Sequence, residues 1–247
     1  MEDGAIAAFE VIMPRRPALE GGMSMKGIDR LYGAFKASLR ANPKQFAPLQ
    51  VVSRLEEYLT KEFCSVIFLK SDRAILPLTS PGQRADNRKI DMAFLEGDLS
   101  KALDKPTAKS QRDKLVIRAF VEVKYLRNRH RFGYSDAQDE IQPTLKNLSK
   151  QLGKFDLTEY AGYRVDLRGR RKDIYGLVLA SYVRRRHEND DHRVFVRRIT
   201  KCGREHGLRH WDLPNPQLDL VYANEPVTIL RGEYNASLYA GLWRLAD

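Results

Sequence analysis

The order of apolar and polar positions divides the chain into helical and extended segments. One apolar stripe predicts a helix over residues 49–63, and it consists of Val52, Leu55, Leu59 and Phe63. Similar stripes predict three further helices, at residues 28–39, within 136–155 and at 190–204. Short apolar runs predict strands, at residues 65–70, 90–95, 115–126, 174–183 and 218–223. The polar stretch 97–114 predicts a loop, and residues 227–243 fit either strands or a helix.

These elements follow one another as helix, three strands, helix and strand, which predicts a mixed α/β domain with a central mixed sheet flanked by helices. The run at residues 174–183 is apolar almost throughout and predicts a central strand that is buried on both faces. Prolines and glycines separate residues 1–25 from the rest, and we expect them to form an N-terminal arm with a strand at 6–13. The remaining chain divides into a core over residues 26–185 and a basic C-terminal elaboration over 186–247, packed on the same domain.

Composition adds a large excess of positive charge to this picture. The chain has 247 residues, with 43 Lys and Arg against 32 Asp and Glu, and its net charge is +11. Residues 127–210 hold 20 of the basic and 11 of the acidic residues, so nearly all of the excess lies there. With 43% hydrophobic residues and 2 cysteines, the chain is neither a disordered polyelectrolyte nor a disulfide scaffold. We therefore expect a folded protein with an anionic partner.

The cysteines and the apolar segments indicate a cellular setting. No apolar stretch has the length of a membrane-spanning helix, and no segment has the pattern of a signal peptide, so we expect a cytoplasmic protein without a membrane partner. Cys64 and Cys202 are expected to be reduced thiols. Cys202, His206 and His210 are spaced four apart, but glycines lie between them and no fourth ligand follows, so zinc is not expected.

Charged residues stand inside two of the predicted strands. Asp91 lies in the strand at residues 90–95, and Glu122 and Lys124 lie two residues apart in the strand at 115–126. Strand alternation places Glu122 and Lys124 on the same face of the sheet. Charges in a sheet interior are costly unless they pair or bind a metal, and carboxylates on neighbouring strands can hold a hard divalent cation. The simpler alternative is an ion pair between strands on a solvated face of the sheet.

Asp91, Glu122 and Lys124, in this order and in these strands, resemble the motif of the PD-(D/E)XK nuclease superfamily, which has the restriction-endonuclease-like fold. The element order over residues 49–183, a little over half of the chain, is similar to the αβββαβ core of that family. The sequence departs from the motif at Ile90, where a proline is common. It also departs in the 30 residues between Asp91 and Glu122, a long gap that a polar insertion accounts for.

The resemblance implies a hydrolase, a metal-dependent nuclease that cleaves phosphodiester bonds, with DNA favoured as its substrate and products that carry a 5′-phosphate. Asp91 and Glu122 would hold Mg²⁺, for which Mn²⁺ can substitute, and the Val123 carbonyl would be a further ligand. Lys124 would orient or activate the attacking water and stabilise charge on the phosphate. The family often adds an acidic residue from the first core helix, and Glu56 is our candidate because it borders the apolar stripe of that helix.

Two of these candidates also have simpler roles. Glu56 can equally be a surface residue of its helix. Gln138 stands where the family often supplies a polar residue after the motif strand, which makes it a candidate accessory residue. Its spacing from Ser135 fits a helix cap better.

Basic residues gather after the motif strand and in a later helix. Arg127, Arg129 and Arg131 follow the strand directly, where the site is expected to open. In the helix at 190–204, four basic residues form a stripe opposite the apolar side: Arg193, Arg197, Lys201 and Arg204. Such a stripe can follow phosphates or enter a groove of double-stranded DNA, and the plain alternative is a solvated helix face.

Two other functions fit the same residues. A non-catalytic nucleic-acid-binding protein would use the basic helix at 190–204 alone, and a protein-interaction factor would set its basic face against an acidic partner. Because cutting both strands of a duplex usually needs two sites, a homodimer is expected by analogy only.

Overall fold

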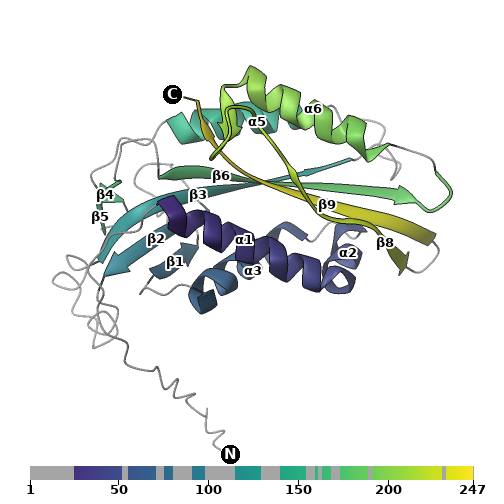
Figure 1. The fold of residues 1–247 in the computed structure, drawn as a ribbon, viewed down its shortest axis with the longest axis horizontal. Coiled ribbons are helices and arrows are strands. Elements are labelled where there is room, and N and C mark those ends of the chain that lie inside the picture. Colours follow the sequence, from purple (N-terminus) through teal and green to yellow (C-terminus); the bar gives the residue numbers. More distant parts are fainter. Residues whose placement is uncertain are drawn as a thin grey trace, which may run out of the picture.

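The chain folds into three layers, with a sheet between two groups of helices (Figure 1). The computed structural model describes residues 25–51, 55–70, 75–79, 91–97, 115–128, 140–153, 159–160, 163–167, 173–188, 191–229 and 232–246. One outer layer contains α1 (Met25–Ala41), α2 (Pro43–Val51) and α3 (Leu55–Lys70). The other outer layer contains α5 (Ile141–Gly153) and α6 (His192–Glu205).

The middle layer is a sheet with nine strands among the described residues. Its main path runs β1-β2-β3-β6-β9-β7, in which the strands are β1 (Ile75–Thr79), β2 (Met92–Gly97), β3 (Leu115–Arg127), β6 (Ile174–Arg185), β9 (Gly232–Leu245) and β7 (Leu208–His210). Off this path lie β8 (Asp219–Ile229), which pairs with β9, and the short strands β4 (Glu159–Tyr160) and β5 (Tyr163–Val165) beside β3.

The sheet is mixed because two of its long internal strands, β3 and β6, run in the same direction. β3 and β6 are parallel, whereas β1 with β2, β2 with β3, and β6 with β9 are antiparallel. Parallel neighbours need a long crossover connection, and α5 lies within the crossover from β3 to β6 and packs on both strands. The mixed α/β class that the sequence predicts is confirmed.

Alternate residues of the strands enter two hydrophobic cores, one on each face of the sheet. On the side of α1 to α3, the rings of Phe35, Phe63 and Phe94 meet edge to face, with centroids 5.0 and 6.5 Å apart. On the side of α5 and α6, the apolar stripe of α5 meets buried side chains of the sheet, including Trp243 of β9. In β6 every residue from 174 to 183 is buried, so the predicted central strand is confirmed.

The predicted helix at residues 49–63 is two helices in part, because it covers the end of α2 and the first part of α3. The other helix and strand predictions hold with one change of type. The predicted strand at residues 65–70 is wrong, because this segment is the last part of α3, and the first strand is β1. Leu59, Phe63 and Val66 are all buried and follow helical spacing, so the apolar stripe of the helix continues through the segment. The ambiguous stretch at 227–243 is extended, since it spans the end of β8 and most of β9.

Some predictions fall on residues outside the described part of the chain. These are the arm with its strand at 6–13 and the loop over 98–114. No helix in the described part of the chain is long and apolar enough to cross a membrane.

Candidate functional site

The start of β2 brings Asp91 against the middle of β3. The ladder between the two strands begins at the pair Met92 and Val121, and Asp91 precedes it. Its Oδ2 accepts a hydrogen bond of 2.7 Å from the backbone N–H of Val123. The side chain of Asp91 therefore occupies the place where the next ladder bond to β3 would form, and this contact fixes one carboxylate oxygen.

Glu122 and Lys124 share the sheet face that α5 covers. Their strand neighbours Phe120 and Leu126 belong to the core beneath α5 and α6, whereas Val121 and Val123 belong to the opposite core. The predicted alternation along β3 is thus confirmed. Glu122 is the cross-strand neighbour of Gly176 in β6.

Glu122 is a buried carboxyl whose nearest positive charge is on its own strand. Its side chain is 4% exposed, and Lys124 Nζ donates a hydrogen bond of 2.5 Å to its Oε1. Burial raises the pKa of Glu122 and outweighs the hydrogen bond and the charge of Lys124, which lower that pKa. The charge of the Asp91 carboxylate also raises the pKa of Glu122, whereas the backbone N–H of Asp91 lowers it.

The second oxygen of Glu122 makes this pair fit a metal ion. Glu122 Oε2 is buried and has no hydrogen-bond partner among the described residues. In a strand the N–H and C=O of one residue point to the same side, so the Val123 carbonyl is directed toward the edge where its N–H meets Asp91. Two carboxylates and a carbonyl are hard oxygen donors of the kind that Mg²⁺ prefers. The described residues contain no cluster of three or more His, Cys, Asp or Glu, so they supply at most two acidic ligands here.

Sequence reasoning missed Gly176, which lies beside Glu122 on the neighbouring strand β6. A Cβ at this position would lie 2.9 Å from both methyl carbons of Leu148 in α5. The absence of a side chain therefore lets α5 pack directly on β6 beside Glu122. A lone glycine inside the apolar run 174–183 is a sequence signal for such a close approach.

The other predicted site residues are only partly brought to this place. Glu56 lies in the first turn of α3, but its side chain is outside the described part, as are Arg129, Arg131 and Gln138. Arg127 ends β3 and, by the alternation of the strand, lies on the opposite face from Glu122 and Lys124. The structure therefore separates Arg127 from Glu122, because an odd step along a strand leads to its other face.

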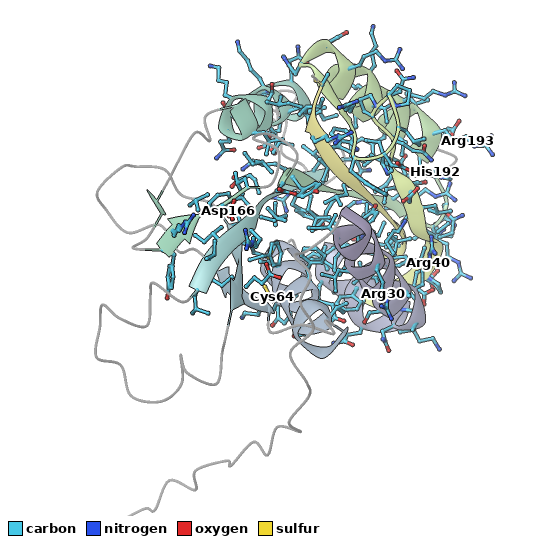
Figure 2. The ribbon with its side chains drawn as sticks, turned by 60° about the vertical axis from the view of Figure 1, so that its left-hand side comes forward. Arg30, Arg40, Cys64, Asp166, His192 and Arg193 are labelled. Atoms are coloured by element: carbon cyan, nitrogen blue, oxygen red, sulfur yellow. The ribbon has the colours of Figure 1, made fainter. Side chains whose placement is uncertain are left out.

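The predicted basic helix is confirmed as α6, in the same outer layer as α5. Asp191 caps it, with its Oδ1 accepting a hydrogen bond of 2.8 Å from Arg193 N. The basic stripe is exposed and consists of Arg193, Arg197, Lys201 and Arg204. Ile199 and Cys202 face the core, and Figure 2 shows Arg193 pointing away from the body of the protein.

Cys202, His206 and His210, whose spacing could suggest zinc, do not form a metal-binding cluster in the described part of the chain. Cys202 is buried and contacts the side-chain oxygen of Gln142 in α5, and His210 is buried in β7. Neither Cys64 nor Cys202 forms a disulfide, as predicted.

No protein-family model, no curated protein and no solved structure matches this chain. Its described residues offer an acidic pair in which one buried oxygen has no hydrogen-bond partner among them, an adjoining lysine and a separate basic helix.

Proposed function

We propose that the protein is a Mg²⁺-dependent nuclease that hydrolyses phosphodiester bonds, with DNA as its substrate. The observation that carries this proposal is the buried Glu122 Oε2, which has no hydrogen-bond partner among the described residues and lies beside Lys124. An unsatisfied buried carboxylate oxygen is costly, and a cation is the partner that suits it. The order α3, β1, β2, β3, α5, β6 further supports a restriction-endonuclease-like αβββαβ core.

Each residue has a distinct part in this reaction. Asp91 and Glu122, with the Val123 carbonyl, would hold the cation. A cation held there would lower the pKa of a bound water and polarise the phosphate. The hydrogen bond from Val123 N keeps the Asp91 carboxylate in place before any ligand arrives. Lys124, whose side chain is 21% exposed, can release Glu122 and turn its ammonium toward the water and the phosphate oxygens. The products would carry a 5′-phosphate and a 3′-hydroxyl.

A cleavage assay tests the proposal. The protein is incubated with linear and circular DNA in Mg²⁺, in Mn²⁺ and in EDTA, beside Asp91→Asn, Glu122→Gln and Lys124→Ala. Lys61→Ala, an exposed lysine on α3 in the opposite layer, is the matched control. We expect metal-dependent cleavage that each site substitution lowers by at least about a hundredfold, while the control retains it. Cleavage that persists in Asp91→Asn and Lys124→Ala would overturn the assignment.

A second function, nucleic-acid binding without cleavage, is favoured by the exposed basic stripe of α6. This stripe does not depend on the acidic pair, since it lies on a different element of the same layer. Binding would then weaken steeply with salt and be unaffected by EDTA or by Asp91→Asn. Binding without cleavage in any divalent metal would select this second function.

A further inference from the structure

α6 presents positive charge along its whole length. It has 14 residues and is about 21 Å long at 1.5 Å per residue. Its exposed basic residues are Arg193, Arg197, Arg198, Lys201 and Arg204. Two described acidic residues adjoin this face. Asp191 caps the helix at Arg193 N, and Glu205 lies 4.0 Å from Lys201 Nζ with both side chains largely exposed, a pair that neutralises little. A regular stripe of this length suits an extended polyanion.

The buried side of α6 argues against a lipid surface as the partner. Ile199, Cys202 and Gly203 are buried, and a Cβ on Gly203 would lie 2.8 Å from the Trp243 ring. A helix that lies on a membrane inserts its apolar face into the lipid. The apolar face of α6 is already occupied by the protein core, so only its charged face is available.

The aromatic residues near α6 argue against single-stranded nucleic acid. Single-strand binders stack successive bases on exposed aromatic rings. Here His192 packs against Tyr182 and Tyr239, with ring centroids 6.3 and 5.8 Å apart, and Phe195 packs against Tyr182 at 5.7 Å. These rings contact one another, and the exposed positions of α6 carry no aromatic residue.

The exposed face also contains one apolar side chain among the arginines. Val194 is 63% exposed, the most exposed of the large hydrophobic residues in the described part of the chain. It lies one turn from Arg197 and Arg198 near the start of the helix. In DNA-binding helices, arginines contact phosphates and guanine, and small apolar side chains contact the thymine methyl group in the major groove.

We propose that α6 is a recognition helix that lies in the major groove of B-form DNA. That groove is about 12 Å wide and admits a helix, whereas the major groove of double-stranded RNA is too narrow and deep for side chains to read. The inference rests on the proposed function for its substrate and deepens it, because it makes that substrate double-stranded DNA. The first turns of α6 would place Val194 at the base edges, with Arg193 and Arg197 against the phosphates that border the groove.

Binding is measured in EDTA with the Asp91→Asn protein, so that cleavage plays no part. Fluorescence anisotropy compares a labelled DNA duplex, its single strands and the matching RNA duplex over about 50 to 200 mM salt. The variants are Arg193→Gln/Arg197→Gln and Val194→Ser. Lys44→Gln/Lys61→Gln, with exposed lysines of the opposite layer, is the control. Interference by methylation of guanine N7, which lies in the major groove, reports the groove that is used.

We expect the DNA duplex to bind at least about tenfold more tightly than the single strands or the RNA duplex. The double arginine variant should bind at least about tenfold more weakly and lower the slope of log K against log salt by about 2, since each phosphate contact contributes about 0.9. Val194→Ser should weaken binding to thymine-containing duplexes more than to uracil-containing ones. Guanine N7 methylation should interfere.

Four results would overturn this inference: equal or tighter binding of single strands or RNA, no effect of the arginine pair, an equal effect of the control pair, or binding unaffected by N7 methylation. Binding of an acidic protein through these arginines, with no affinity for DNA, would also overturn it. Metal-dependent cleavage by a protein whose α6 variants bind DNA normally would refute the α6 inference alone. Duplex binding through α6 without cleavage would refute the nuclease proposal alone.

Discussion

Replacing Glu122 with Gln should stabilise the metal-free protein at neutral pH and abolish its stabilisation by Mg²⁺. Burial raises the pKa of Glu122 above its unfolded value of 4.5, so the folded state favours the neutral carboxyl. An acid with a raised folded pKa contributes stability that is complete below the unfolded pKa and is lost as the pH rises through the folded pKa. At pH 7, which lies above the unfolded pKa, burial of the Glu122 carboxyl therefore costs the wild-type protein stability that a glutamine does not lose.

The size of this effect follows from the contacts of the carboxylate. Lys124 satisfies Oε1, whereas Oε2 has no hydrogen-bond partner among the described residues. A buried polar group without a partner costs about 1–3 kcal/mol, and more when it is charged. Removing the charge should raise the free energy of unfolding by about 1 kcal/mol, or the Tm by about 2–4 °C for a chain of this size.

Thermal and urea unfolding of both proteins, in EDTA and in Mg²⁺, check this prediction. In EDTA, Glu122→Gln should be the more stable protein at pH 7.5, and the difference should vanish below about pH 4.5. In Mg²⁺ the order should reverse, because a ligand at a hundred times its Kd adds about 2.7 kcal/mol to the wild type alone. Glu205→Gln, at an exposed position, is the control. A Glu122→Gln protein that is less stable in EDTA at pH 7.5, or that Mg²⁺ stabilises equally, would refute the reasoning.

Three further predictions concern the scaffold. Gln50→Ala should lower the free energy of unfolding, measured in urea, by roughly 2–5 kcal/mol, because the buried hydroxyl groups of Ser181 and Tyr222 lose their partner. The control Gln45→Ala, at an exposed position of the same helix, should change this free energy by less than about 0.5 kcal/mol. Gly241→Ala should lower the free energy of unfolding by about 1–3 kcal/mol in the same assay, since the new Cβ would lie 2.6 Å from the Gln217 carbonyl oxygen. An unchanged urea midpoint would contradict this packing. Burial lowers the pKa of His210. The stability that neutral His210 contributes is therefore present above its unfolded pKa of 6.5 and is lost as the pH falls through the folded pKa. His210→Gln should flatten the pH dependence of the Tm below pH 6.5, and an unchanged dependence would rule out this role.

The sequence predicts the fold well where apolar periodicity and burial agree. The run at 174–183 is apolar almost throughout, and it is the buried central strand β6. The apolar stripe within 136–155 is long and regular, and α5 follows it. The run at 65–70 misleads because a short apolar run fits a buried helix turn as well as a strand, and only the packing of Phe63 and Val66 decides between them.

In the candidate site, likewise, the sequence predicts the features that depend on one strand alone and misses those that depend on tertiary packing. The alternation of β3 is local, so the common face of Glu122 and Lys124 follows from the sequence. The bond from Val123 N to Asp91 depends on the register between β2 and β3, which no single-strand pattern contains. The close approach of Leu148 to Gly176 depends likewise on how α5 crosses the sheet.

A crystal structure of the protein soaked in Mn²⁺ tests the central claim most directly, because the metal identifies itself by its anomalous scattering. The proposed nuclease site predicts a peak within metal-ligand distance of a carboxylate oxygen of Asp91, of Oε2 of Glu122 and of the Val123 carbonyl oxygen. The peak should be absent in Glu122→Gln crystals soaked in the same way. A wild-type map without a peak between Asp91 and Glu122 would contradict the claim that this acidic pair is a metal centre.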